Sequence, residues 1–136
     1  MSRGKSARQF ALDLRKFGKV TREQATMIFR KITLELDSRV VLGTPVDVGR
    51  ARGNWFPSLN TPATGTTDKA DPTGSAALAE INSLVGSARL GDTVWLTNNL
   101  PYILPLENGH SKQAPDGMVD INLNAIAAFY GGSIER

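Results

Sequence analysis

Residues 98–115 constrain the fold of this chain more than any other stretch. Their sequence, NNLPYILPLENGHSKQAP, contains three prolines, one glycine and the single histidine of the chain. Each proline fixes φ and lacks an amide donor, so the stretch cannot form a regular helix or a central strand. It predicts a shaped polar loop, which is where a small protein usually carries its function.

The length of 136 residues predicts a single domain, 1–136, with a core of modest size. We expect a basic helical part, 1–43, followed by a mixed α/β part, 44–136. The chain has no cysteine, which excludes disulfides and thiolate chemistry. It shows neither a signal peptide nor an apolar run long enough to span a membrane, so we expect a soluble protein made in the cytoplasm.

Hydrophobic periodicity and capping signals predict the elements. Residues 6–17 predict a short helix, and residues 21–42 a long one that Thr21 and Gln24 begin with a capping box and Gly43 ends. Strands are predicted at 50–56, closed by Pro57, and at 92–97. Shorter helices are predicted at 75–84, 102–108 and 119–130. The predicted class is therefore α+β, with the long N-terminal helix packed on a small antiparallel β-sheet and a long mobile loop.

That loop is residues 57–77. It holds three prolines, two glycines and five threonines, with Leu59 as its only large aliphatic residue. So little apolar surface does not offset the entropy of ordering, which predicts mobility. The segment is either a free linker or an arm that orders on a partner.

The long helix carries two apolar stripes. The main stripe consists of Ala25, Ile28, Phe29, Ile32, Leu36 and Val40. The second stripe consists of Met27, Leu34 and Val41. Two stripes predict that other elements pack on both sides of this helix. The element that packs on the second stripe is either the first helix or another subunit. Arg30 and Asp37 flank the second stripe and are placed to pair across such a subunit interface.

Charge is distributed unevenly. Residues 1–39 contain ten Lys or Arg and four acids, whereas residues 40–136 contain six bases and nine acids. A solvated helical face explains this pattern, as do contact with nucleic acid and head-to-tail packing of copies. The basic residues lack the aromatic interleaving of a single-strand platform, and there is no helix-turn-helix or zinc-finger pattern.

Nothing in the sequence predicts catalysis. It has no P-loop, GxSxG or HExxH motif. Glu107 and His110, with Asp47 or Asp116 nearby, are the only basis for a carboxylate–histidine site. One histidine with scattered carboxylates is a poor metal site. We therefore expect no enzyme activity, no metal and no cofactor.

A second polar segment, TPVDVGRARGNW at residues 44–55, precedes the loop 57–77. In it Asp47 is placed to cap backbone donors or to pair with Arg50 or Arg52, and Trp55 is predicted to be core. In the segment 98–119, Glu107 is placed to accept hydrogen bonds from Ser111, His110 or backbone N–H groups.

The two segments in this order resemble the tail-completion or neck proteins of long-tailed bacteriophages, relatives of the lambda-type minor tail proteins. The family pattern is TPVDTGR followed by NxxPYAxxLExGHSxQAPxGMV. Val48 stands here in place of the usual threonine, and Ile103, Leu104 and Pro105 replace a smaller stretch. The match is specific because both motifs are present.

The resemblance implies a structural protein of the virion, made in the host cytoplasm, that completes the tail and joins it to the head. It implies a homo-oligomeric ring, typically a hexamer. Its partners would be the tail tube or tail terminator protein on one side and the head-completion or connector protein on the other. Contact between the basic helices and genomic DNA in the lumen is a further expectation, and no membrane is involved.

The interface candidates are therefore residues of the long helix and of the two motifs. They are Met27, Arg30, Leu34, Asp37, Val41, Asp47, Arg50, Arg52, Tyr102, Glu107, His110 and Lys112. The alternative hypothesis is a small DNA-binding protein that uses residues 3–39. A hydrolase built on Glu107 and His110 is the third.

Overall fold

The computed structural model describes residues 7–11 and 13–135, and these form an α+β fold, as predicted. The helical elements are η1 (Leu14–Phe17, a 3₁₀ turn), α1 (Arg22–Gly43), α2 (Arg50–Gly53), α3 (Ser75–Ser87), α4 (Ile103–Glu107) and α5 (Asp120–Tyr130). The strands are β1 (Gln9–Ala11), β2 (Phe56–Leu59), β3 (Val94–Thr97) and β4 (Ser133–Glu135).

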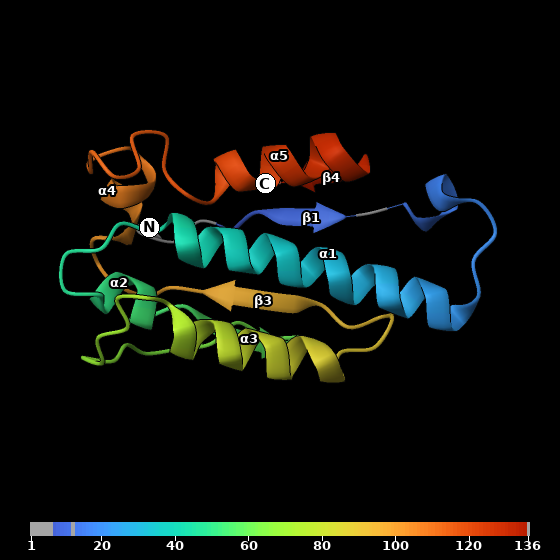
Figure 1. Ribbon diagram of the computed structural model, residues 1–136, viewed down its shortest axis with the longest axis horizontal. Helices are drawn as coiled ribbons and strands as arrows, with labels where there is room; N and C mark the ends of the chain where they lie inside the picture. Colours follow the sequence, from blue (N-terminus) through green and yellow to red (C-terminus); the bar gives the residue numbers. More distant parts are fainter. Residues whose placement is uncertain (1–6, 12, 136) are drawn as a thin grey trace.

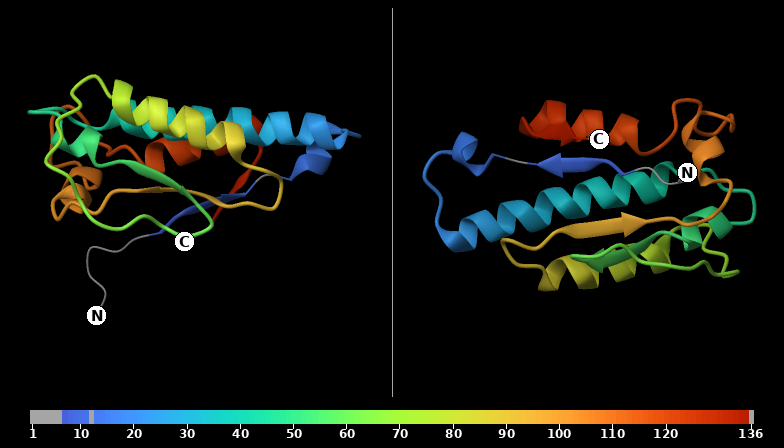
Figure 2. Two further views of the ribbon diagram at one scale, coloured as in Figure 1. Left: turned by 90° about the horizontal axis from the view of Figure 1, so that it is seen from below. Right: turned by 180° about the vertical axis from the view of Figure 1, so that it is seen from behind.

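The long helix α1 lies between α3 and α5, and both of these run antiparallel to it (Figure 1). Strands lie in a second layer beneath the helices, as the view from below shows (Figure 2). The predicted antiparallel sheet is present as two separate two-stranded pairs, β2 with β3 and β1 with β4. In the first pair Phe56 lies opposite Thr97, and in the second Phe10 lies opposite Ile134.

Local signals set both ends of α1 where the sequence predicts them. The Thr21 hydroxyl accepts from the Gln24 N–H at 3.1 Å, and the Gln24 side chain accepts from the Thr21 N–H at 2.9 Å. These two bonds complete the predicted capping box and satisfy amides that the helix leaves unpaired. The helix ends at Gly43, as predicted.

The core lies between α1, α3 and the β2–β3 pair. Its buried members are Val40, Val41, Ala51, Trp55, Ala77, Ile81, Val85, Leu100, Ile103 and Met118. Trp55 is core, as predicted. The second stripe of α1 is covered by α3 of the same chain, whereas the first helix or another subunit was predicted. The cover ends short of Met27, which is 69% exposed.

The predicted helix at 6–17 is wrong in its first half, where β1 forms instead; Ser6 and Leu12 lie outside the described residues. Pairing with β4 determines this strand. Gly132 permits the pairing, because a Cβ at that position would collide with the Phe10 ring. This tertiary contact is invisible to local propensity. Leu14–Phe17 is helical, as a 3₁₀ turn that ends before Gly18.

The predicted strand at 50–56 is also wrong. Residues Arg50–Gly53 form the short helix α2, and β2 begins only at Phe56. Pro57 lies inside β2 instead of closing the strand. It is tolerated there because β2 is an edge strand, where a missing amide donor breaks no ladder bond. The predicted helices at 75–84, 102–108 and 119–130 correspond to α3, α4 and α5.

In the part of the chain that the structure describes, no helix has the length and apolar character needed to cross a membrane.

Thr44 joins the end of α1 to the core. It is 1% exposed, and its hydroxyl accepts from the Trp55 indole N–H at 2.8 Å and donates to the Val40 carbonyl at 2.7 Å. We expect Thr44→Val to lower the free energy of unfolding by about 1–3 kcal/mol, because the buried indole N–H loses its acceptor. Urea unfolding followed by tryptophan fluorescence measures this change.

Thr44→Ser is the matched control. It keeps the hydroxyl and loses one methyl group, so a loss of only about 1 kcal/mol is expected. If the serine variant were as unstable as the valine variant, the hydrogen bond to Trp55 would not be the stabilising interaction.

Candidate functional site

The two sequence motifs meet at one end of the molecule, beyond the C-terminal end of α1 (Figure 1). The Gln113 side chain joins them. Its oxygen accepts from the Val46 N–H and its amide donates to the Val46 carbonyl, both at 2.8 Å. This pair of bonds imitates a strand pairing and fixes one loop against the other. No local pattern in the sequence indicates the role of Gln113, because its partner lies 67 positions away.

Arg52 holds the first motif against the end of α1. Its guanidinium donates to the carbonyls of Thr44 at 2.9 Å, Leu42 at 2.8 Å and Pro72 at 2.8 Å. Two of these carbonyls belong to the last turn of α1 or its cap, which lack partners within the helix. Arg52 is therefore an internal support of this end of the fold.

Arg50 and Asp47 do not form the predicted pair. The Arg50 guanidinium contacts the Asp68 carboxylate at 3.2 Å and donates to the Thr67 carbonyl at 3.2 Å. Since Arg52 binds carbonyls and Arg50 binds Asp68, the predicted ion pair with Asp47 is wrong. Asp47 is exposed.

The loop 57–77 is held to the body of the protein at several points, contrary to the prediction of a segment without internal partners. The buried Asn54 amide donates to the Arg50 and Thr67 carbonyls and accepts from the Thr67 N–H, at 2.8–2.9 Å. The buried Asp71 carboxylate accepts from the Ala76 and Ala77 N–H groups at the start of α3, at 3.3 and 2.9 Å. Hydrogen bonds therefore supply the contacts that apolar burial does not.

Glu107 caps the N-terminal end of α5. Its carboxylate accepts from the backbone N–H groups of Met118, Val119 and Asp120 at 2.8–2.9 Å. A negative charge beside these unpaired amides is stabilising. The predicted role as an acceptor from backbone amides is confirmed, with these three donors. Gly117 makes the approach possible, since a Cβ there would collide with the Glu107 carbonyl.

His110 is exposed, and its backbone N–H donates to the Pro105 carbonyl at 3.1 Å. The Glu107 carboxylate is occupied by three amides, so nothing places it against the histidine as a catalytic pair. Among the described residues no group of three or more His, Cys, Asp or Glu is arranged to hold a metal ion.

The end of the molecule therefore presents side chains from the last turn of α1 and from segments whose backbone is already held. Leu42 is 50% exposed, Val48 66% and Tyr102 39%. The exposed polar residues around them are Asp47, His110 and Lys112. We call these six residues the motif surface. Three of the six are exposed apolar side chains, which suits a protein partner better than a small molecule.

The candidates on α1 separate into exposed and internal residues. Met27 is exposed, Leu34 packs against the core and Val41 is fully buried. The Arg30 guanidinium donates to the Ala88 carbonyl at 2.9 Å, and Asp37 is buried. The predicted pairing of Arg30 with Asp37 across an interface is therefore wrong, and Val41 is not available to one. α3 takes the place that either the first helix or another subunit was predicted to fill.

Burial raises the pKa of Asp37 from 3.8 to about 7. One of its carboxylate oxygens, Oδ2, has no hydrogen-bond partner in the described structure. Desolvation without a compensating donor disfavours the ionised form.

Much of the basic charge of the N-terminal part is engaged within the chain. Arg8 contacts Asp120 at 3.1 Å, Arg15 contacts Asp13 at 3.0 Å and Arg39 contacts Glu35 at 3.4 Å. Lys19, Arg22 and Lys31 are exposed. The Arg15 and Arg39 side chains remain 92% and 48% exposed, so this pairing offsets local charge without burying these two bases.

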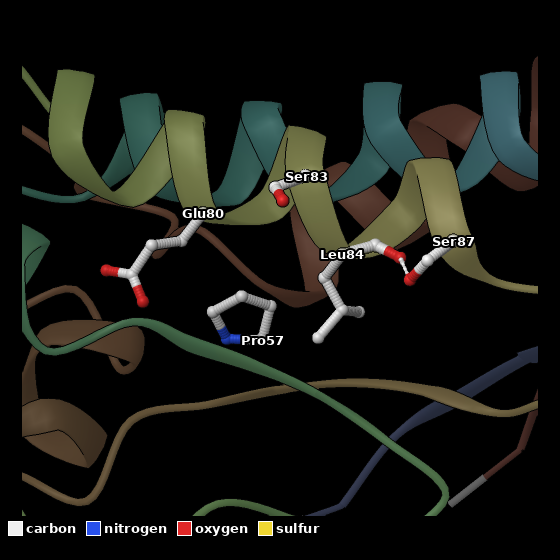
Figure 3. Close-up of a pocket in the computed structure, with 5 residues that line it drawn as sticks. All are labelled: Pro57, Glu80, Ser83, Leu84 and Ser87. Carbon is white, nitrogen blue, oxygen red and sulfur yellow. Dashed lines mark hydrogen bonds between the residues drawn. The ribbon is translucent and has the colours of Figure 1, made fainter.

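A shallow groove of about 410 Å³ lies between α3 and β2 (Figure 3). Its lining residues are Pro57, Glu80, Ser83, Leu84 and Ser87. The Ser87 hydroxyl donates to the Leu84 carbonyl at 2.8 Å. The lining has one carboxylate and two serines but no histidine or lysine, and within the described residues no hydrogen bond joins Glu80 to either serine, so it shows no activated nucleophile.

Comparison of the chain with protein-family models, with curated proteins and with solved structures gives no match.

The raised pKa of Asp37 predicts a pH dependence of stability. Between about pH 4 and about pH 7 the unfolded chain releases this proton while the folded chain keeps it, so the free energy of unfolding falls as pH rises. We expect the wild-type protein to lose a few kcal/mol across this window relative to Asp37→Asn. Urea unfolding of both proteins at a series of pH values measures the difference. Parallel curves would contradict the assignment.

The cap on α5 predicts a large effect of Glu107. We expect Glu107→Ala to lower the free energy of unfolding by about 2–3 kcal/mol, because three amides lose a charged acceptor. His110→Ala, three positions away with an exposed side chain, should change it by less than about 0.5 kcal/mol. Thermal and urea unfolding of the two variants test the contrast, and equal losses would argue against the cap.

Proposed function

We propose that this chain is a structural protein of a bacteriophage neck or tail, which completes the tail and joins it to the head as a homo-oligomeric ring. The observation that carries the proposal is that polar side chains of the two motifs bind backbone groups of the same chain. Gln113, Glu107 and Arg52 bind backbone groups, and none of them is directed into a cleft. Polar residues used in this way build a preorganised surface, which lowers the entropic cost of docking.

The motif surface is the side that meets another protein in this proposal. Its partner is the tail tube or tail terminator protein, or the head-completion or connector protein. Exposed apolar side chains such as Val48 and Tyr102, with charged residues around them, resemble the core and rim of protein interfaces. The protein then resides in the virion.

Neither alternative gains support from a particular contact. For DNA binding, Arg8, Arg15 and Arg39 are paired with carboxylates of the same chain. For hydrolysis, the carboxylate of Glu107 is used as a helix cap. The proposal of a structural role needs neither a free base cluster nor a reactive group.

Deletion of the gene from the phage that carries it tests the function. We expect filled heads and finished tails to accumulate separately in electron micrographs, because the joint between them is missing. Joined, infectious particles in normal yield would refute the proposal. Supplying the wild-type protein should restore them.

A variant of the motif surface tests the site. We expect Val48→Asp combined with Lys112→Glu to keep the wild-type urea midpoint, since both side chains are exposed. The same variant should fail to restore joined particles, because charge replaces an apolar contact and reverses another. Thr66→Asp, in an exposed part of the loop 57–77, is the control and should restore them.

A further inference from the structure

The chain contains one Asn–Gly pair, Asn108–Gly109, which directly follows α4 at the end of the molecule that carries the motif surface (Figure 1). Asparagine is chemically labile, and most so before glycine, which has no side chain to shield its backbone nitrogen from the neighbouring amide. The Asn108 side chain is exposed, and it makes no hydrogen bond within the described residues. Neither burial nor a partner therefore protects this side-chain amide.

The fold itself requires the glycine of this pair. Gly109 has a φ of +86°, a left-handed conformation that other residues rarely adopt. A Cβ at this position would also collide with the Pro115 carbonyl oxygen. The loop after α4 cannot exchange Gly109 for a bulkier residue, so the susceptibility of Asn108 is a consequence of the shape of this loop.

The folded backbone holds the pair away from the reactive geometry. Ring closure needs the Gly109 nitrogen close to Cγ of Asn108, so the C–N bond has to eclipse the Cα–Cβ bond. At the observed ψ of 11° the C–N bond instead nearly eclipses the Cα–N bond of Asn108. The Gly109 N–H also donates to the Leu106 carbonyl at 3.1 Å, which holds its proton in place. The reaction therefore requires this turn to open.

The turn that has to open is a weak one. α4 has only five residues, and the pair is at its C-terminal end, where helices fray. The N–H groups of Asn108, Gly109 and His110 donate to carbonyls of the preceding turn at 2.9–3.1 Å. Asn108 and His110 are exposed, so water reaches these bonds. A local opening thus gives access to the reactive geometry without unfolding of the core.

We propose that Asn108 is a site of spontaneous deamidation, gated by opening of the last turn of α4. The Gly109 backbone nitrogen gives its proton to solvent base and attacks Cγ of Asn108. The new C–N bond closes a succinimide ring, while the bond from Cγ to Nδ2 breaks and the amide leaves as ammonia. Water then opens the ring at either carbonyl and leaves aspartate or isoaspartate. The net reaction consumes one water and releases one ammonia.

The isoaspartate product does not fit the folded loop. It routes the main chain through the side chain and adds one methylene group between positions 108 and 109. Gly109 then loses its close position against Pro115, and Gln113, further along the loop, loses its bonds to Val46. The reaction detaches the second motif from the first and so removes the shape of the motif surface. This consequence is independent of the proposed function, because it does not depend on what the surface binds.

Ageing of the purified full chain tests the site. The protein is incubated at mildly alkaline pH, and peptide mapping by mass spectrometry follows each asparagine. We expect Asn108 to deamidate at least about tenfold faster than Asn82 and Asn124, which are also exposed but precede serine and alanine within longer helices. Asn108→Gln keeps an exposed amide but closes this ring far less readily, so it should stay unmodified. Equal rates at the three asparagines would overturn the proposal.

Urea tests the gate. In the unfolded chain we expect Asn108 to react at least about tenfold faster than in the folded chain, because the turn no longer holds ψ. Below the unfolding transition the rate should not change with urea concentration, since a local opening exposes little surface. A rate that rises in step with global unfolding would overturn the local gate. Equal rates in the folded and unfolded chain would overturn it too.

Hydrogen exchange tests the consequence for the loop. In the isoaspartate fraction of aged wild-type protein we expect residues 109–117 to exchange at least about tenfold faster than in fresh protein, with the amides of α3 unchanged. Aged Asn108→Gln protein is the matched control and should keep the pattern of fresh protein, since its substitution is on the surface. Unchanged exchange in a fraction that contains isoaspartate at position 108 would show that the product leaves the loop intact and would overturn this step.

Discussion

The carbonyl groups at the C-terminal end of α1 need hydrogen-bond donors that the helix itself does not contain. Two side chains supply them. The Thr44 hydroxyl binds the Val40 carbonyl, and Arg52 binds the carbonyls of Leu42 and Thr44. Arg52 also binds the Pro72 carbonyl, and Thr44 also binds the indole of Trp55. Completing the end of one helix thus positions α2, the loop 57–77 and the central tryptophan together.

A second set of polar contacts extends this arrangement to the C-terminal part of the chain. Glu107 satisfies the first amides of α5, and Gln113 binds both backbone groups of Val46. Gly109 and Gly117 have positive φ, and a side chain at either would collide with a backbone carbonyl. The conformation of the two motifs is therefore fixed by contacts within the second motif and by the bonds of Gln113 to the first. Glu107, which suggests an active site in the sequence, holds backbone in place instead.

The sequence predicts those parts of the fold whose causes are local. The capping box of Thr21 and Gln24, the apolar periodicity of α3 and α5, and the β-branched and aromatic run of β3 each lie within one segment. The rest depends on partners far along the chain. β1 exists because it pairs with β4, and the loop 57–77 is held by Asn54 and Asp71. A polar loop also looks mobile when only its apolar content is counted, since the donors that hold it belong to other segments.

The same reasoning explains why the candidate site was only partly predictable. The two motifs meet at one end of the molecule, and Glu107 accepts from backbone amides, as predicted. The second stripe on α1 shows that an apolar neighbour is needed, but it does not identify that neighbour. The prediction was the first helix or another subunit, whereas α3 of the same chain covers the stripe. Once α3 and α5 have each packed one face on α1, their remaining faces lie on opposite flanks. In the proposed function, the end built by the two motifs is the surface that meets a different protein.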